Sequence, residues 1–272
     1  MVRRSRLDAE LVRRGLARSR EEASSLVIAG RVMIGGTVAS KAATNVSADA
    51  AIVVANDEDS RRYVSRGAYK LAGALDAFQP AGLQVEGRRC LDVGASTGGF
   101  TDVLLRRGAA CVVAVDVGYG QLAWSLRTNA RVRVVDRTNA RDLTPQLIGG
   151  RVDLIVADLS FISLSLVLPA LHGCVEDGGD LVLMVKPQFE VGRERVGARG
   201  VVRDPVVRRD AVRGVVQRAS HLGLGVQGVV ASPLPGPSGN VEYFVWLAAR
   251  PGAIEGSTLD DAIQRAVEEG PR

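Results

Sequence analysis

The fold is decided by residues 88–100, which read Arg-Arg-Cys-Leu-Asp-Val-Gly-Ala-Ser-Thr-Gly-Gly-Phe. The stretch begins as a short apolar strand with Asp92 near its end, and a glycine turn from Gly94 to Gly99 follows. The amphipathic run at 100–107 predicts a helix directly after the turn. A strand, a glycine turn and a helix start together form a nucleotide-binding crevice, because the turn lets a ligand approach backbone N–H groups at the helix N-terminus.

Strands and helices alternate on both sides of this stretch. Expected strands lie at 90–93, 111–115, 132–135, 154–157, 180–185, 226–231 and 241–247, and expected helices at 68–79, 99–107, 121–126, 164–171 and 205–222. The strands are apolar nearly throughout, which is typical of a parallel sheet covered by helices on both faces. The sequence therefore predicts a doubly wound, Rossmann-like α/β domain at 67–250, then a polar tail at 251–272 with a short helix at 259–268.

The first 59 residues predict a separate, smaller α+β domain. The expected elements are a helix at 6–14, a helix after a Ser19–Glu22 capping box, a hairpin at 32–39 around Gly35-Gly36, and a strand at 51–54. A charged stretch without periodicity follows, and we place a linker at 60–66.

Positive charge is concentrated in this first domain. Residues 1–45 hold nine Lys or Arg and four Asp or Glu, a net charge of +5, which equals the formal charge of the whole chain. The remainder of the chain is therefore balanced. A basic face of this kind predicts a polyanionic partner, with solvated helix faces as the alternative.

The cysteines and the N-terminus indicate the compartment. Cys90, Cys111 and Cys174 have no paired spacing, so we expect small buried thiols in a reduced compartment and neither disulfides nor a metal site. The sequence Met-Val-Arg-Arg-Ser-Arg has no apolar signal core, and no run approaches the roughly 18–20 apolar residues of a membrane span. We expect a soluble, cytoplasmic and monomeric protein that makes no membrane contact.

The glycine turn alone does not name the ligand, because nicotinamide, flavin and S-adenosylmethionine proteins all use one. Ser96 replaces the glycine that a pyrophosphate needs, and the carboxylate of Asp92 suits a ligand that carries an ammonium and a sulfonium. Asp116 can accept ribose hydroxyls or cap a helix, and Asn139 can meet an adenine edge or simply form a turn. The combination favours S-adenosylmethionine. The predicted cofactor residues are Asp92, Gly94, Ala95, Ser96, Thr97, Gly98, Gly99, Asp116, Asn139 and Asp158.

Residues at the ends of the expected strands exclude some classes of methyl acceptor. The string Asp158-Leu-Ser-Phe161 lacks the proline pair of enzymes that methylate base amino groups, and no cysteine has the proline neighbour expected for methylation of a pyrimidine carbon. What remains are four charges, Lys70, Asp158, Lys186 and Glu242. Methyl transfer to a ribose hydroxyl needs a positioned base, and a lysine can accept the proton when burial and a second cation disfavour its ammonium form.

We therefore predict Lys186 as the main proton acceptor, with Asp158 orienting it and with Lys70 and Glu242 completing the charge set. A structural ion pair is the alternative for any one of these residues alone. Two rival functions also stay open: a non-catalytic RNA-binding ribosome factor with a degenerate methyltransferase fold, and a small-molecule methyltransferase. The intact set of four charges argues against the first, and the basic N-terminal domain argues against the second.

The four charges match, in order and context, the Lys-Asp-Lys-Glu set of FtsJ-like ribose 2′-O-methyltransferases. The match extends over the strings Ser-Arg-Gly-Ala-Tyr-Lys-Leu, Asp-Val-Gly-Ala-Ser-Thr-Gly-Gly-Phe-Thr, Ala-Asp-Leu-Ser-Phe-Ile-Ser, Val-Lys-Pro-Gln-Phe-Glu and Ser-Gly-Asn-Val-Glu-Tyr-Phe. Residues 5–55 resemble the S4 RNA-binding domain through Leu7-Asp8, Leu11, Gly15, Ser19-Arg20, Ala23, Gly30-Arg31-Val32 and Gly36.

Together these features resemble the TlyA family of ribosomal RNA methyltransferases. The resemblance implies a class I methyltransferase fold, S-adenosylmethionine as cofactor, and formation of 2′-O-methylcytidine on small- and large-subunit ribosomal RNA, with a link to sensitivity to capreomycin-type antibiotics. The segment Arg61-Arg62-Tyr63-Val64 resembles the family's Arg-Ala-Trp-Val linker, implicated in cofactor binding, but differs at two positions. Some members are called haemolysins, and this sequence gives that name no support.

The resemblance also implies which residues hold RNA. In the S4 family, paired helices present cations to folded RNA. These cations bind the RNA phosphates without reading the base sequence. The predicted RNA-binding residues are Arg4, Arg6, Arg14, Arg18, Arg20, Lys41 and Phe161. Phe161 can stack on a flipped base or belong to the core. The stretch 191–201, rich in glycine and arginine, predicts either a mobile lid that touches RNA or a surface loop.

Overall fold

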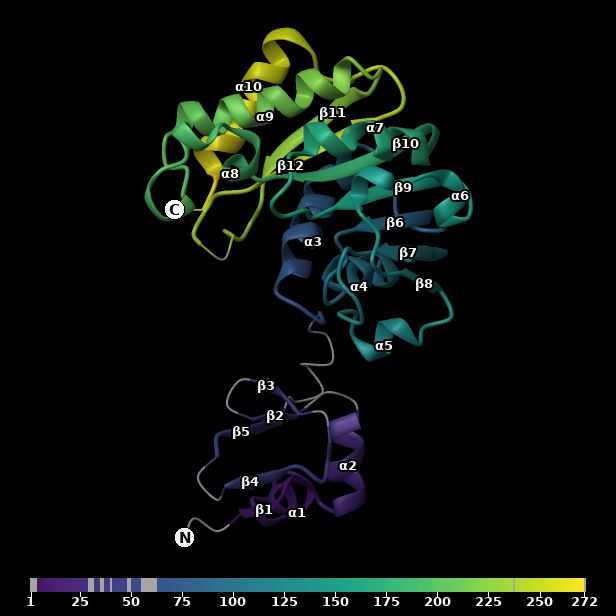
Figure 1. Cartoon of the computed structure of the whole chain (residues 1–272), viewed down its shortest axis with the longest axis vertical. Helices are drawn as coiled ribbons and strands as arrows, with labels where there is room; N and C mark the ends of the chain where they lie inside the picture. The colour runs from purple at the N-terminus through teal and green to yellow at the C-terminus, as the bar shows by residue number, and fades with distance from the viewer. Residues whose placement is uncertain are drawn as a thin grey trace. The chain divides into compact units, whose positions relative to one another are not determined.

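The computed structural model describes residues 4–28, 32–34, 37–39, 41–47, 50–54, 63–236 and 238–271. The chain divides into two compact units, 1–62 and 63–272 (Figure 1). Three parts of the sequence-based predictions lie outside the described residues: the Gly35-Gly36 turn, the Gly30-Arg31 step and the Arg61-Arg62 half of the linker.

The first unit contains the two predicted helices and two small sheets. Its elements are β1 (Arg4–Arg6), α1 (Leu7–Arg13), α2 (Arg20–Ile28), β2 (Val32–Ile34), β3 (Thr37–Val38), β4 (Asn45–Ser47) and β5 (Ile52–Val54). The strands pair antiparallel as β1-β4 and as β3-β2-β5. The capping box is confirmed in part, since Glu22 N donates to Ser19 Oγ at 3.1 Å, whereas the Glu22 carboxylate accepts from Arg18 N.

The sequence did not predict the β1-β4 pair, because each strand is only three residues long and has no readable alternation. The pair nevertheless closes the small core, in which Leu7, Leu11, Ala23 and Val46 are buried. This core holds α1 against α2 and against the strands.

The second unit is built on a seven-stranded sheet with the order β11-β12-β10-β9-β6-β7-β8. Its strands are β6 (Arg89–Val93), β7 (Cys111–Val115), β8 (Val132–Val135), β9 (Val152–Ala157), β10 (Val175–Val185), β11 (Gly225–Ala231) and β12 (Tyr243–Ala248). The β12 strand runs antiparallel to both of its neighbours, and the five strands from β10 to β8 are parallel. The predicted Rossmann-like architecture is confirmed.

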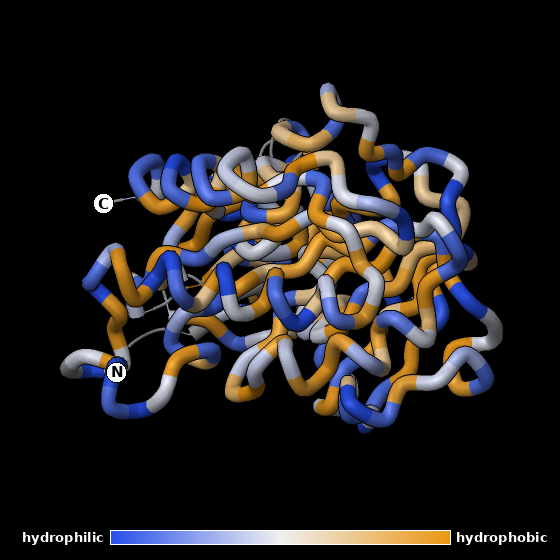
Figure 2. Tube along the Cα trace, turned by 90° about the horizontal axis from the view of Figure 1, so that it is seen from above, coloured by the Kyte–Doolittle hydropathy of each residue, from blue (hydrophilic) through white to orange (hydrophobic). Residues whose placement is uncertain are grey.

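Helices cover both faces of this sheet. One face packs on α3 (Gly67–Phe78), α4 (Gly99–Arg106) and α5 (Trp124–Arg127), and the other on α7 (Leu164–Cys174), α9 (Pro205–Ser220) and α10 (Gly256–Glu269). Shorter helices are α6 (Pro145–Ile148), α8 (Pro187–Glu190), η2 (Gln79–Ala81), η3 (Ala140–Asp142), η4 (Arg193–Arg195) and η5 (Ala198–Gly200). In Figure 2 the central strands are mostly hydrophobic, whereas the outer helices alternate between hydrophilic and hydrophobic residues.

The C-terminal segment differs from the expected polar tail. Helix α10 is 14 residues long, and Ile263, Ala266 and Val267 on one of its faces are buried in the core of the second unit. Arg213 of α9 contacts Asp260 of α10 at 2.6 Å. The segment is polar on average but amphipathic at helical spacing, and helical spacing decides whether a helix docks.

No helix in the described part of the chain is long and apolar enough to cross a membrane.

Candidate active site

The sheet register brings the predicted charges to one edge. Val93 of β6 pairs with Ala157 of β9, Ala157 pairs with Leu183 of β10, and Val185 of β10 pairs with Tyr243 of β12. Gly94, Asp158 and Lys186 therefore follow neighbouring strand ends, and Glu242 directly precedes β12 at the same edge. The chain order reverses between β6 and β9, which is where ligands bind in open α/β sheets.

Two ion pairs with buried lysines occupy this edge. Lys186 Nζ lies 2.5 Å from Asp158 Oδ1 and donates to Ser160 Oγ at 3.0 Å. Lys70, from the first turn of α3, donates to Glu242 Oε2 at 2.5 Å. Both lysine side chains are 9% exposed, and that of Glu242 is 1% exposed. All four predicted catalytic residues thus lie in two pairs at the same place.

Two adjoining cavities open at these pairs. A cavity of about 370 Å³ is lined by Lys70, Asp158, Ser160 and Lys186. A larger cleft of about 1260 Å³ extends over the ends of β6, β7 and β9 and includes Asp116 and Asn139. The two share Gly94, Ser96, Asp158 and Ser160, so the cleft leads directly to the lysines.

The glycine turn is shaped by packing as much as by access for a ligand. Gly94 has φ +85°, and a Cβ there would lie 2.5 Å from the backbone oxygen of Asp158. Gly98 has φ +97° and caps α4, beside Leu122 and Leu126. Gly94 therefore lets β6 and β9 approach each other and lines the cleft, whereas Gly98 lets the start of α4 approach Leu122 and Leu126.

Most of the predicted cofactor residues line one of the cavities. Gly94, Ser96, Asp116, Asn139 and Asp158 line the cleft, and Ala95, Thr97 and Gly99 line the smaller cavity. Asp116 accepts from Ser96 N at 2.8 Å and from Gly118 N at 2.7 Å. Asn139 faces the cleft and also accepts from Arg141 N at 3.0 Å as the N-cap of η3, so both of its predicted roles are compatible with the structure.

Asp92 and Gly98 line neither cavity. Asp92 is fully buried and accepts from Thr101 Oγ1 at 2.7 Å, and within the described residues its Oδ1 has no partner. Burial raises the pKa of this carboxyl to about 7. The structure therefore places Asp92 beneath the turn and not where it would contact a ligand directly, because the side chain of this strand residue points to a covered face of the sheet.

Phe161 is not a core residue. Its side chain is 91% exposed, its φ is +64°, and its ring centroid lies 5.2 Å from that of Phe189. The core alternative is wrong, because Phe161 stands at the rim of the cleft. A bulky residue at positive φ is strained, and such strain is concentrated at functional sites.

Several lining residues were missed by the sequence reasoning. Ser160, Gln121, Arg141, Phe189 and Arg193 all line one of the cavities. Ser160 and Phe189 belong to sequence strings that support the family resemblance. Their place in these strings could have identified them as site residues. The 191–201 stretch contributes Arg193 and Val196 to the cleft wall, so part of it is more than a surface loop.

In the first unit, the predicted RNA-binding arginines are gathered by buried carboxylates. Asp8 contacts Arg6 at 2.8 Å and Arg20 at 3.1 Å, and Glu10 contacts Arg14 at 2.8 Å. Arg6 holds the pKa of Asp8, and Arg13 together with Arg14 holds that of Glu10, well below the usual range of a carboxyl. Arg18 and Lys41 are exposed, and the side chain of Arg4 lies outside the described residues.

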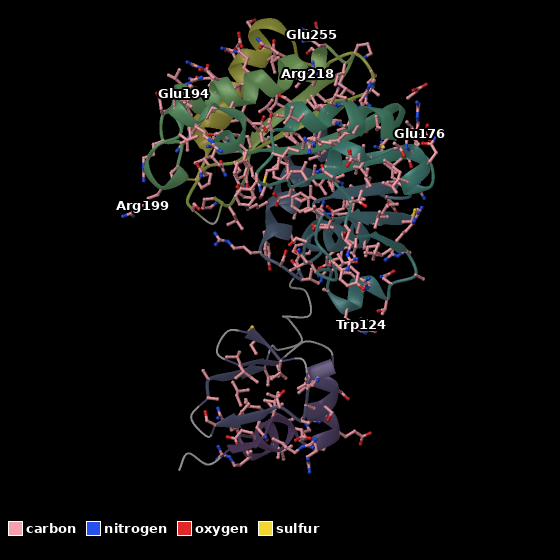
Figure 3. The ribbon with its side chains drawn as sticks, viewed as in Figure 1. Trp124, Glu176, Glu194, Arg199, Arg218 and Glu255 are labelled. Atoms are coloured by element: carbon pink, nitrogen blue, oxygen red, sulfur yellow. The ribbon has the colours of Figure 1, made fainter. Side chains whose placement is uncertain are left out.

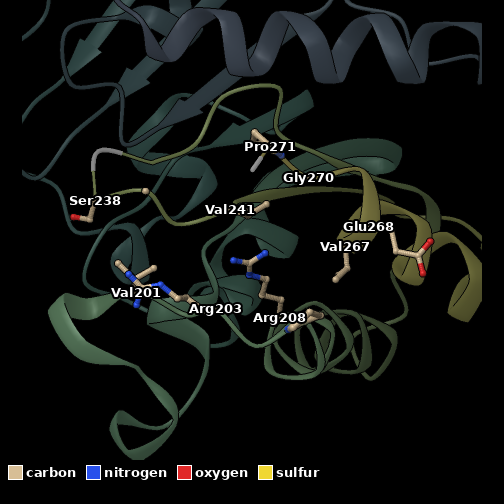
Figure 4. Close-up of a pocket in the computed structure, with 11 residues that line it drawn as sticks. Val201, Arg203, Arg208, Ser238, Val241, Val267, Glu268, Gly270 and Pro271 are labelled. Atoms are coloured by element: carbon tan, nitrogen blue, oxygen red, sulfur yellow. The ribbon is translucent and has the colours of Figure 1, made fainter.

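Another cavity, of about 600 Å³, lies near α9 and the end of α10, with Arg203, Arg208 and Glu268 on its wall (Figure 4). It contains no residue predicted for catalysis. Among the described residues, no group of three His, Cys, Asp or Glu is arranged to hold a metal ion.

The sheet order, the glycine turn and the cleft between β6 and β9, where the strand order reverses, define a Rossmann-like methyltransferase domain. The chain belongs to the FtsJ-like methyltransferase family, whose model matches residues 63–249, and it also carries an S4 domain, matched at residues 5–52.

Similar proteins are known over the full chain. The 16S/23S rRNA (cytidine-2′-O)-methyltransferase TlyA of Mycobacterium tuberculosis is 62% identical over 272 residues and covers 100% of both chains. Hemolysin A of Brachyspira hyodysenteriae is 37% identical and covers 88% of this chain and 98% of its own. A solved structure from Streptococcus thermophilus, also named as a hemolysin, has a TM-score of 0.72 at 37% identity and covers 99% of this chain and 98% of its own.

Proposed function

We propose that this protein transfers the methyl group of S-adenosylmethionine to the ribose 2′-hydroxyl of cytidine in small- and large-subunit ribosomal RNA. The observation that carries the proposal is the pair of buried lysines, each held by a carboxylate, at the end of the cleft. The name of the M. tuberculosis relative, 62% identical over its full length, supports the substrate. The S4 domain supports binding to RNA.

The cleft fits S-adenosylmethionine. Each oxygen of Asp116 accepts one backbone N–H, which leaves lone pairs that can accept ribose hydroxyls. Val117, 74% exposed and on the cleft wall, offers an apolar surface beside the adenine position. The side chain of Asn139 reaches the same wall. We propose these residues, with the glycine turn, as the cofactor site.

Residues of this chain accept the proton that the ribose hydroxyl loses. When bound, S-adenosylmethionine supplies an electrophilic methyl group on a sulfonium. As the hydroxyl oxygen forms its bond to that carbon and the carbon–sulfur bond breaks, the hydroxyl loses its proton. In this proposal the proton passes to Nζ of Lys186, which Asp158 and Ser160 hold in place. Lys70, fixed by Glu242, places positive charge where negative charge develops on oxygen.

Both units contribute residues to the proposed RNA binding. We propose that Arg6, Arg14, Arg18, Arg20 and Lys41 bind phosphates of folded RNA through the S4 unit. Phe161, exposed at the cleft rim, is placed to stack on the target base. We further propose that the protein acts as a cytoplasmic monomer, which size-exclusion chromatography with light scattering would test.

The test is transfer of a radiolabelled methyl group from S-adenosylmethionine to separated ribosomal subunits. Wild type should label both subunits at a cytidine ribose, and Lys186→Ala should lower the rate by about 10²- to 10⁴-fold without weakening RNA binding. Arg151→Ala removes an exposed pair with Asp177 and is the matched control. Wild type that binds ribosomal RNA but labels neither subunit would instead support a non-catalytic ribosome factor.

A further inference from the structure

An exposed aromatic pair stands on the segment between β7 and β8. Of the protein's two tryptophans, Trp246 is 2% exposed, whereas Trp124, at the start of α5, is 75% exposed. Tyr119, five residues earlier, is 66% exposed. Figure 3 shows Trp124 at the outer end of α5. Large aromatic side chains are seldom left this open to water unless they contact a partner.

The turn that carries Tyr119 is rigidly held. Gly118 N donates to Asp116 Oδ1 at 2.7 Å, Gly118 O accepts from Arg137 N at 2.9 Å, and Gly120 N donates to Asp136 Oδ2 at 3.3 Å. Tyr119 is therefore fixed relative to Asp116, a residue of the proposed cofactor site. The segment also contributes Val117 and Gln121 to the cleft wall, so the turn with Tyr119 lies between two residues of that wall.

Two arginine side chains lie close to the ring of Tyr119. The guanidinium of Arg137 lies 4.4 Å from the ring centroid of Tyr119, and that of Arg127 lies 6.0 Å from it. Arg127 is also paired with Asp136 at 3.1 Å, but no carboxylate in the described part of the chain pairs with Arg137. Arg137 holds φ +56°, an uncommon conformation that persists only when its surroundings enforce it.

The charge of this segment suits RNA. Residues 117–141 contain five arginines and one aspartate, a net charge of +4, although the chain beyond residue 45 is balanced as a whole. Exposed aromatic rings beside unpaired arginine are the combination that binds unpaired nucleotides, with bases on the rings and the guanidinium planes and phosphates near the positive charge. Neither a duplex nor an acidic peptide requires the aromatic rings.

We propose that Tyr119, Trp124 and Arg137 form a stacking platform for unpaired nucleotides of the substrate RNA, next to the proposed cofactor cleft. The identity of the substrate as ribosomal RNA rests on the proposed function. The platform itself requires only a single-stranded segment, so the two proposals can fail separately.

Tryptophan fluorescence of the full chain tests the platform directly, because Trp246 is buried and Trp124 is not. The probe is a protein-free RNA hairpin with a cytidine-containing loop of unpaired nucleotides, and a blunt duplex of equal length is its control. Addition of the hairpin should quench the emission of Trp124, the duplex should quench it much less, and Trp124→Phe should abolish the response.

Affinity provides a second measurement. Base stacking on one aromatic side chain contributes about 1–3 kcal/mol, so Trp124→Ala should weaken hairpin binding by roughly 5- to 150-fold. Arg137→Ala, which removes a guanidinium plane and a positive charge, should weaken it by roughly 5-fold or more. Arg218→Ala, an exposed arginine of α9 on the other face of the sheet, removes the same charge and should weaken binding far less (Figure 3). Thermal unfolding confirms that each variant is folded.

The outcomes separate the two proposals. Quenching and affinity loss without methylation of either ribosomal subunit would keep the platform and overturn the proposed function. Methylation by wild type, with a silent Trp124 and unaltered hairpin affinity in both variants, would overturn the platform alone. Weakened binding to whole subunits but not to the protein-free hairpin would point to a ribosomal protein as the partner and would also overturn the platform.

Discussion

Both units bury carboxylates that hold cations, but the cations end in different surroundings. In the first unit Asp8 is 3% exposed, while the side chains of Arg6 and Arg20 that it contacts are 51% and 59% exposed. In the second unit both lysine side chains are only 9% exposed, beside Glu242 at 1% and Asp158 at 24%. The same type of ion pair therefore presents a cation to solvent in one unit and encloses it in a cavity in the other.

The difference suits the chemistry proposed for each unit. An exposed guanidinium fixed by a carboxylate can bind a phosphate at a small desolvation cost, because a guanidinium is only weakly hydrated. An enclosed ammonium interacts more strongly with a charge that develops beside it, because little water screens the field. Removing the carboxylate should thus impair binding in the first unit, and both stability and chemistry in the second.

The largest effect is expected at the enclosed pair of Lys70 and Glu242. Glu242→Gln leaves a buried ammonium without its counter-charge and should lower the free energy of unfolding by about 3–5 kcal/mol. The double variant Lys70→Met with Glu242→Leu should regain most of that stability in urea unfolding and still show a methyl-transfer rate at least about 100-fold below wild type. A stable double variant with full activity would mean that the pair is only structural.

Asp92 is a buried carboxylate whose partner is a hydroxyl and not a cation. Because burial raises its pKa to about 7, the folded state holds a proton that the unfolded state loses near pH 4. The resulting stabilisation is complete below pH 4 and is lost as the pH rises toward 7, an upper bound of roughly 4 kcal/mol.

Asp92→Asn should remove this pH dependence. Urea unfolding at pH 5 and pH 8 should show a smaller decline for the variant than for wild type, with Asp76→Asn, a surface carboxylate, as control. Equal declines in wild type and Asp92→Asn would show that the carboxyl is ionised throughout this range.

A smaller effect is expected at Asp8. Asp8→Asn makes the first unit more positive, which by charge alone would tighten binding to RNA. If Asp8 positions Arg6 and Arg20, affinity for ribosomal RNA should instead fall by roughly 10-fold, or about 1.4 kcal/mol, with S-adenosylmethionine binding unchanged. Tighter binding in a filter or fluorescence assay would show that the arginines act only through their charge.

The smallest effect should come from a pair in which both partners are exposed. The side chains of Arg213 and Asp260, between α9 and α10, are 38% and 58% exposed. Arg213→Ala should change the free energy of unfolding by less than about 1 kcal/mol, because water solvates both charges. A loss of 3 kcal/mol or more would mean that this ion pair, and not Ile263, holds α10 in place.

The sequence predicted the sheet and the charged site well for a simple reason. Long apolar strands are easy to recognise, and in a parallel sheet the residues that follow them meet at one edge. That rule alone brings Asp158 beside Lys186. The same rule explains what could not be predicted. It says at which edge of the sheet a residue lies, but not in which direction its side chain points.

Other features depend on contacts that no local pattern records. Asp92 looked like a ligand residue, but its side chain lies under the turn against Thr101. The exposure of Phe161 and the burial of Ile263 depend on what the rest of the chain leaves uncovered. The balanced charge of residues 46–272 concealed the basic segment 117–141, because acidic residues elsewhere cancel it in a sum but not in space.

The pairing of Lys70 with Glu242 has a consequence for biosynthesis. The two residues are 172 positions apart, and Glu242 precedes the last strand of the sheet. A ribosome must therefore add 172 residues after Lys70 before the buried ammonium meets its counter-charge. A product terminated before Glu242 would lack both the carboxylate and the strand that pairs with β10, so it would leave the edge of β10 unpaired and expose apolar surface. The ion pair and the complete sheet therefore form at the same stage of synthesis.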